Sequence, residues 1–368
     1  MTPVEFRREL HRHPELSFKE FKTQQFIIDS LGKAGIACRP IATTGVLAVV
    51  EGRRGNHQRA VVLRADIDAL PIEELNDVEY RSTNRGVMHA CGHDMHAAML
   101  FGVVEELARE RDFEGTLFCI FQPGEELNPG GASLVLKEEP FAGYDVAAVI
   151  GQHVDARLEV GQIGICPGRF MASNDELRFR VVGRGGHAAR RRDIRDTVTA
   201  MADMVMRTTA LNSPDGVVSV GRVVADGATN VIPDVVTAEG TMRTFAAEER
   251  ERIYQHLAGN ASFVEERYGV KVEVDISRGY PCVVNDVMLS YEAMIVAMDE
   301  GIEVRELEPM TTAEDFGYYT ERYPSLFYRL GVGSSSGSPH TATFLPDERA
   351  LEVGVCMMRR MALHILNK

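Results

Sequence analysis

The residues most suited to chemistry lie in one short stretch, HACGHDMH, which runs from His89 to His96 and holds three His, one Cys and one Asp. Cys91 and His93 supply a thiolate and an imidazole two residues apart, and both are ligands for a borderline-soft divalent cation such as zinc. A mixed set of sulfur, nitrogen and carboxylate donors is more typical of a catalytic metal than of a cysteine-rich structural site. The alternative is a buried thiol beside solvated or capping histidines, but it explains one Cys and one His better than five ligand-competent side chains. We therefore predict a metal site here.

Further acidic and histidine side chains follow predicted strands at the points where these strands end. They are Asp66 and Asp68 after the apolar run 60–65, Glu125 and Glu126 after 116–121, His153 after 146–150, and His340 beyond 326–330. Ligands of open α/β sheets bind outside the carboxyl ends of the strands. We therefore expect these side chains to converge on one edge of a sheet.

The roles of these residues differ in how strongly the pattern supports them. Pro and Gly in FQPGEE force the chain out of the strand, so that Glu125 and Glu126 point different ways. One carboxylate can then bind a metal while the other faces a water molecule. For His153 the neighbouring ligand-bearing strands favour a ligand role over a structural one. For His340 the residue pattern alone leaves both roles equally open.

Composition places the chain among ordinary globular proteins, with 368 residues, 45% of them hydrophobic and 26% charged. A net charge of −14 disfavours nucleic acid and anionic membrane surfaces as partners. The N-terminus lacks the apolar run of a secretory signal, and no stretch approaches the roughly 20 apolar residues of a membrane span. The six cysteines show no paired spacing, so we expect a reducing cytoplasm, which keeps Cys91 available as a thiolate.

The order of predicted elements indicates two domains. In the first half, helices alternate with short apolar strands, which is typical of a mostly parallel sheet covered by helices. Between residues 172 and 280 the order becomes β-α-β-β-α-β, the ferredoxin-like pattern, and α/β character returns from about residue 281. We predict a metal-binding catalytic domain of residues 1–171 and 281–368, with an inserted α+β domain of residues 172–280.

The chain resembles the M20 family of metallopeptidases and amidohydrolases, in the aminoacylase-like branch that includes hippurate hydrolases, indole-acetyl-amino-acid hydrolases and N-acetyl-diaminopimelate deacetylases. The resemblance covers nearly the whole chain. It is carried, in family order, by LHRHPELSFKE, RADIDALP, MHACGHDMHAA, FQPGEE, GQHV, GRGGHAA, NVIP, GTMRT, TAEDF and PHTATF. It implies a metal-bearing α/β domain and a smaller lid domain that also forms a homodimer.

The resemblance also implies roles for individual residues. Glu125 corresponds to the general base, and Asp68 to the acid that supports the metal site. His187 in GRGGHAA corresponds to a histidine that binds the substrate carbonyl, often in a neighbouring subunit's site, and Asn230 and Arg243 correspond to lid residues near the substrate. The ligands of one or two divalent ions (zinc, manganese, cobalt or nickel) would be Cys91, His93, Glu126, His153 and His340.

The sequence departs from the family pattern after GGHAA, where relatives usually have a Pro-His pair and this chain has Arg190, Arg191 and Arg192. Three cations replace a neutral contact, so substrate contact and a solvated surface are equally open interpretations of this run.

The implied reaction is metal-dependent hydrolysis of the amide bond of an N-acyl amino acid or a similar amidated amino acid, to a carboxylic acid and a free amino acid. A dipeptidase or aminopeptidase of the same family would use the same centre on a short peptide. A catalytically inactive binding relative is the other alternative, but Glu125 and the ligand set are intact.

Overall fold

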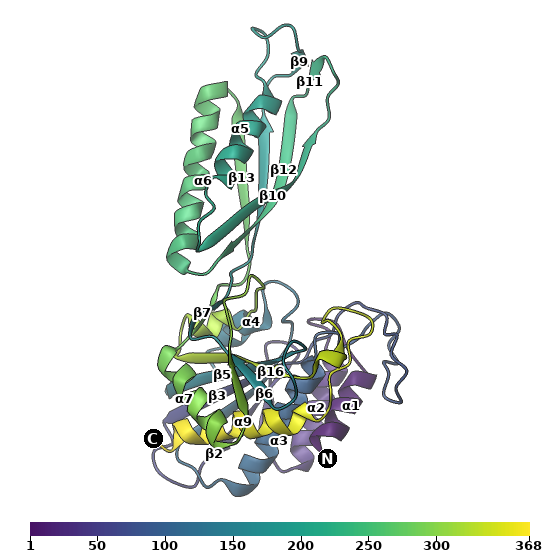
Figure 1. Cartoon of the computed structure of the whole chain (residues 1–368), viewed down its shortest axis with the longest axis vertical. Helices are drawn as coiled ribbons and strands as arrows, with labels where there is room; N and C mark the ends of the chain where they lie inside the picture. The colour runs from purple at the N-terminus through teal and green to yellow at the C-terminus, as the bar shows by residue number, and fades with distance from the viewer. The chain divides into compact units, whose positions relative to one another are not determined.

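The computed structural model describes residues 1–368 and divides into two compact units (Figure 1). The larger unit comprises residues 1–170, 284–308 and 315–368, and the smaller comprises 171–283 and 309–314. The segment 309–314 joins the smaller unit because Met310 forms a bridge with Met171 and its carbonyl accepts a hydrogen bond from the amide of Ala172 at 3.0 Å. Two short strands, β7 (Gly168–Met171) and β14 (Val283–Asn285), lie at the boundaries of the units.

The larger unit is built on a mostly parallel sheet of eight strands in the order β1-β2-β4-β3-β5-β16-β6-β15. The central strands β4, β3, β5 and β16 are mutually parallel, so their carboxyl ends lie at one edge. The strands are β1 (Cys38–Ile41), β2 (Gly45–Glu51), β3 (Arg59–Asp66), β4 (Thr116–Gln122), β5 (Asp145–Asp155), β6 (Gln162–Ile165), β15 (Glu303–Glu306) and β16 (Ser325–Gly331).

The helices of the larger unit follow from local signals and from apolar periodicity. A capping box begins α1, because Thr2 Oγ1 accepts from the amide of Glu5 at 3.2 Å and the Glu5 carboxylate accepts from the amide of Thr2 at 2.8 Å. The long helix α3 contacts both α1 and α9, and Phe101 on α3 stacks on Phe6 of α1 at 4.3 Å. The helices are α1 (Pro3–Arg12), α2 (Phe21–Lys33), α3 (His93–Glu110), α4 (Gly131–Lys137), α7 (Val287–Asp299), α8 (Gly317–Thr320) and α9 (Ala350–Leu366), with a 3₁₀ turn η1 (Ser334–Ser336).

The smaller unit is an antiparallel sheet with two helices, in the chain order β-α-β-β-α-β and the strand order β10-β12-β8-β13. Side chains of β8 alternate, so that Leu177 and Phe179 are buried while Glu176 and Arg178 are exposed. The elements are β8 (Asp175–Val182), β9 (Gly186–His187), α5 (Thr197–Thr209), β10 (Gly216–Ala225), β11 (Val231–Ile232), β12 (Val235–Thr244), α6 (Ala247–Tyr268) and β13 (Lys271–Arg278). No helix in either unit combines the length and the apolar character that crossing a bilayer requires.

Candidate metal centre

Most of the predicted site residues lie at the carboxyl edge of the central strands of the larger unit. Asp66 ends β3, His153 lies near the end of β5, and Glu125 and Glu126 follow β4 after Pro123 and Gly124. A further group comes from the turn before α3 and from the loop after β16. The residues that the structure brings together here are Asp68, Cys91, His93, Glu125, Glu126, His153 and His340.

Cys91 lies at the centre of this group. Its Sγ is 3.3 Å from Nε2 of His153 and 3.3 Å from Nε2 of His340, although the two histidines come from distant segments. Burial raises the pKa of the Cys91 thiol to about 12. A thiolate at this position therefore needs a cation beside it.

The turn that presents Cys91 depends on a glycine. Gly92 has a φ of 87°, and a Cβ there would lie 2.5 Å from a methyl carbon of Val154. Only glycine combines this left-handed backbone with so close an approach. The turn places Cys91 just before α3 and His93 in the first turn of that helix.

His153 has one ring nitrogen free to face Cys91. Its Nδ1 donates to the carbonyl of Val154 at 2.7 Å. Burial, and then the charge of Arg329, lower the pKa of His153, so that the ring is neutral. A neutral ring whose Nδ1 carries the proton leaves the lone pair on Nε2, which is the form in which histidine binds a metal.

His93 is oriented by a carboxylate behind it. Its Nδ1 lies 3.2 Å from Oδ1 of Asp68, while its buried Nε2 has no hydrogen-bond partner. Burial favours the neutral acid, but the hydrogen bond and charge of His93 and the amide of Glu126 lower the pKa of Asp68. Oδ2 of Asp68 also accepts from the Ser17 hydroxyl at 2.7 Å and from the Glu126 amide at 3.0 Å. Asp68 therefore orients His93 and the loop that carries Glu126 together.

The two adjacent glutamates take different positions. Glu125 is buried, and one of its carboxylate oxygens lies within 4.8 Å of a ring nitrogen of His93 and of a carboxylate oxygen of Glu126. Oε1 of Glu126 is 3.3 Å from Nε2 of His340 and 4.0 Å from Nε2 of His93, and no hydrogen bond satisfies it. Buried oxygen and nitrogen atoms without partners are costly unless a ligand pairs them.

His340 reaches this group from the loop after β16. Its backbone has a φ of 62°, and its amide donates to the carbonyl of Ala90 at 2.7 Å. This bond joins the loop to the residue before Cys91. The nearby carboxylate of Glu126, 3.3 Å away, raises the pKa of His340, with burial acting in the opposite direction.

His96, the last histidine of the HACGHDMH stretch, uses both ring nitrogens within the protein. Its Nδ1 lies 2.5 Å from Oδ1 of Asp66, and its Nε2 accepts from the amide of Val154 at 2.9 Å. Asp66 is also paired with Arg64 at 2.7 Å. His96 and Asp66 therefore act as supports for β3, α3 and β5 at the edge of the site.

Sequence reasoning missed a buried network beneath the start of α3. Arg7 Nε lies 2.7 Å from Oδ2 of Asp94, and His11 bridges Asp94 at 2.8 Å and Glu74 at 3.0 Å. Burial lowers the pKa of the neighbouring His89 to about 4, so it is a neutral packing residue. The available signal was an Arg and a His four residues apart on α1, which places both on one helix face.

Glu20 is another residue that sequence reasoning missed. It is fully buried, and its Oε1 accepts from the amide of Gly124 at 2.8 Å while its Oε2 accepts from the Thr44 hydroxyl at 2.6 Å. Glu20 thus holds the turn that leads into Glu125 and Glu126. It lies in the LHRHPELSFKE motif, but no spacing rule connects this motif to FQPGEE.

The donor set fits divalent cations. It offers one thiol, three imidazoles and one carboxylate, and two of its atoms, His93 Nε2 and Glu126 Oε1, are buried without hydrogen-bond partners. Burial lowers the pKa of His93, but the nearby carboxylates of Asp66 and Asp68 raise it above its ordinary value. Two compact donor groups share Cys91: one comprises Cys91, His93 and His153, and the other comprises Cys91, Glu126 and His340.

The remaining predicted residues lie in the smaller unit. His187 on β9 pairs with Val231 on β11, and the carbonyl of Asn230 accepts from the amide of Ala188 at 2.9 Å. His187 and Asn230 are exposed. The run Arg190–Arg192 is also exposed, and Arg190 lies 3.5 Å from Asp193.

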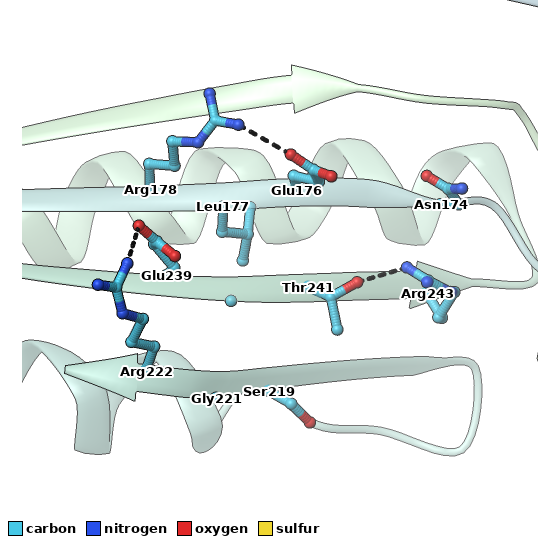
Figure 2. Close-up of a pocket in the computed structure, with 11 residues that line it drawn as sticks. Asn174, Glu176, Leu177, Arg178, Ser219, Gly221, Arg222, Glu239, Thr241 and Arg243 are labelled. Carbon is cyan, nitrogen blue, oxygen red and sulfur yellow. Dashed lines mark hydrogen bonds and ion pairs between the residues drawn. The ribbon is translucent and has the colours of Figure 1, made fainter. Parts of the chain in front are cut away.

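Arg243 lies at the other end of this sheet from His187. Strands β12 and β8 are paired from Val235–Val182 at one end to Met242–Asp175 at the other. Arg243 follows Met242 and so lies at the second end, whereas His187 lies beyond the first. Figure 2 shows Arg243 beside Thr241 at one end of a hollow of about 530 Å³ on the exposed face of the sheet. Its guanidinium donates to Thr241 Oγ1 at 2.5 Å.

Comparison with known proteins finds relatives along most of the chain. The model of peptidase family M20/M25/M40 matches residues 62–364. An N-acetyldiaminopimelate deacetylase from Anoxybacillus flavithermus is 34% identical over 97% of this chain and 96% of the relative. An N-acetyl-L-cysteine deacetylase from Bacillus subtilis is 35% identical over 95% of this chain and 84% of the relative.

A solved structure is also similar over almost its full length. It is a Bacillus subtilis protein described as a dinuclear metal binding peptidase of the M20 family. It has a TM-score of 0.87 and 34% identity, with 99% of this chain and 97% of the other covered. The match of sequence and fold leads to one conclusion: this chain belongs to peptidase family M20/M25/M40.

Proposed function

We propose that this protein is a metal-dependent amidohydrolase that cleaves the amide bond of N-acyl amino acids to a carboxylic acid and a free amino acid. The observation that carries the proposal is a pair of donor groups that share Cys91, with the buried carboxylate of Glu125 beside them. The two relatives described as deacetylases of N-acetylated amino acids support this substrate class. Six free thiols support a reducing compartment, the cytoplasm.

The residues that would hold the metal are Cys91, His93, Glu126, His153 and His340. The two groups that share Cys91 suit one or two divalent ions, and thiolate, imidazole and carboxylate donors together suit zinc, manganese, cobalt or nickel. When bound, such an ion lowers the pKa of a coordinated water toward about 7 and polarises a carbonyl oxygen. Asp68 would hold the proton on His93 Nδ1 and so keep Nε2 available as a ligand.

Glu125 would act as the general base. Its neighbour Glu126 supplies the carboxylate donor, which leaves Glu125 to accept the proton of the attacking water and to deliver it to the leaving amine. We expect Glu125→Gln to keep its metal content and lose about 10²–10⁴-fold in kcat, the range of one acid–base group. Metal analysis by mass spectrometry separates this from a ligand role. Near-normal turnover, or loss of metal, contradicts the assignment.

The smaller unit would act as the lid and as the homodimer contact, and its His187 would donate a hydrogen bond to the substrate carbonyl. His187 and Asn230 lie beyond the Val235 end of β12, and Arg243 lies eight residues along that strand, about 26 Å away at roughly 3.3 Å per residue. A small substrate cannot contact both ends of one such sheet. We therefore propose that His187 and Asn230 serve the partner's site while Arg243 serves the site of its own subunit.

Mixing two inactive variants tests this exchange. His187→Ala keeps Glu125, and Glu125→Gln keeps His187, so a mixed dimer regains one complete site if His187 acts across subunits. Random exchange should restore about a quarter of wild-type activity. If the subunits exchange but no activity returns, His187 acts within its own chain.

A panel of substrates tests the proposed reaction. Release of free amino acid is measured from N-acetyl and other N-acyl amino acids and from dipeptides, with and without a chelator. We expect N-acyl amino acids to be hydrolysed, the activity to disappear with the chelator, and divalent ions to restore it. Hydrolysis of dipeptides alone would assign the centre to a peptidase instead. Inertness toward both panels with a full metal complement would indicate a binding protein.

A further inference from the structure

The helix α7 is apolar on two opposite faces. Its inner face buries Leu289, Ala293, Val296 and Ala297, and the helix contacts α9, β15 and β16. The outer face would be polar in an ordinary surface helix. Here it carries large apolar side chains instead, on the periphery of the larger unit (Figure 1).

The exposed apolar side chains of this region follow a regular spacing. They are Val284 (39% exposed), Val287 (47%), Met288 (66%), Tyr291 (52%), Ile295 (56%) and Met298 (71%), which we call the α7 stripe. Within α7, residues 288, 291, 295 and 298 are separated by steps of three, four and three, while Val284 lies on β14 just before the helix. This is the a/d repeat by which one helix packs its side chains between those of another. The spacing therefore indicates a helical partner.

Charge narrows the choice of partner. α7 contains no Lys or Arg, and one of its two acidic residues, Glu292, pairs with Lys368 and lies 3.6 Å from His364. A stripe without cations has nothing to attract an anionic lipid surface or an acidic protein. A second copy of the same uncharged stripe fits it, because two apolar a/d seams related by a twofold axis are complementary to one another.

The exposed area of the α7 stripe is large enough for an interface between two copies of the chain. The exposed surface of the six residues is on the order of 600 Å², which is at the upper end of what monomeric proteins expose in one apolar patch. Two copies would bury roughly 1,200 Å², and a specific interface needs at least about 1,000 Å².

We propose that the α7 stripe is an interface between two copies of this chain, in which α7 of one subunit packs against α7 of another around a twofold axis. This contact lies in the larger unit and is separate from the contact proposed for the smaller unit. With both contacts the protein is a tetramer, and with the α7 contact alone it is a dimer.

The test is the molar mass of the full-length protein, measured by light scattering and by sedimentation equilibrium. In Ile295→Glu two carboxylates would face each other across the axis, so we expect at least tenfold weaker association and a mass half that of the wild type. Phe21→Glu is the matched control, because Phe21 is exposed to a similar extent (59%) but lies outside the stripe, on α2. The control should keep the wild-type mass, and both variants should keep the wild-type kcat per subunit.

A charge swap decides whether the partner is a second α7. Ile295→Lys should also show the smaller mass, and an equimolar mixture of Ile295→Lys and Ile295→Glu should recover the wild-type mass. Three results would overturn the proposal: a wild type that is monomeric up to about 100 µM, a mass that Ile295→Glu does not change, or a mixture that stays at the smaller mass. Binding of the wild type to neutral lipid vesicles without a change in mass would assign the stripe to a membrane instead.

Discussion

Replacing Arg7 with methionine should destabilise the larger unit far more than the same change at its neighbour Arg8. The guanidinium of Arg7 is fully buried, lies 2.7 Å from Asp94 and 3.1 Å from Glu348, and sits over the ring of Tyr80 at 4.7 Å. Methionine fills much of the same volume but leaves the buried carboxylate of Asp94 with only His11 as a side-chain partner.

The expected size follows from burial. Breaking a buried ion pair by removing one partner costs about 3–5 kcal/mol, because the other charge stays buried without compensation. Arg8 pairs with the same Glu348 at 2.6 Å, but its side chain is 44% exposed, so its loss should cost at most about 1 kcal/mol. For a unit of this size, a loss of about 1 kcal/mol in the free energy of unfolding lowers Tm by roughly 2 °C. We therefore expect Tm to fall by about 6–10 °C in Arg7→Met and by about 2 °C or less in Arg8→Met.

The assay is thermal unfolding by calorimetry at fixed pH and fixed metal content, since a bound metal adds its own stabilisation. Adding Asp94→Asn to Arg7→Met removes the unpaired charge, so the double variant should lose less stability than the two single losses added together, by about 1–3 kcal/mol. Equal losses for Arg7→Met and Arg8→Met, or additive losses in the double variant, would refute the reasoning.

Two further predictions concern the same region. Asp68→Asn should weaken metal affinity about 10–100-fold while the fold is kept, because the hydrogen bond that orients His93 is weakened. Competition with a chromophoric chelator measures the affinity, and an unchanged affinity would contradict this role of Asp68. Burial acts to lower the pKa of His11, but Asp94 and Glu74 raise it above its ordinary value. Its stabilising contribution is therefore complete below pH ~6.5 and is lost as pH rises through the folded-state pKa, so the Tm difference between the metal-free wild type and His11→Gln should shrink from pH 6 to pH 9. A difference that is constant over this range would contradict the assignment.

The grouping of the candidate metal ligands could largely be predicted from the sequence because it depends on local features. Cys91 and His93 are two residues apart, and a tight turn into a helix places both at one helix start. The other predicted donors follow strands, and the mostly parallel sheet carries the ends of these strands to one edge. Strand periodicity and the parallel βα arrangement are properties of short segments, so the sequence shows them directly.

Only the tertiary structure decided which atoms of this centre remain available. His96 and His93 are equivalent by residue type, yet the ring of His96 forms hydrogen bonds with Asp66 and Val154 while Nε2 of His93 has no hydrogen-bond partner. Such differences depend on the direction of each side chain and on its neighbours from other strands. Spacing along the chain does not contain this information.

The buried ion pairs, the separation of the predicted lid residues and the exposed apolar face of α7 also depended on tertiary packing. Arg7 contacts Asp94 across 87 residues of sequence, and β12 separates His187 from Arg243, a distance that the motifs alone do not reveal. The apolar stripe of α7 was hidden for a related reason. A helix that is apolar all round shows no face preference, and only packing against α9, β15 and β16 reveals which side is left exposed. The sequence by itself therefore determined which chemistry this protein can contain, whereas long-range packing decided which groups are paired, which are free and which faces remain open.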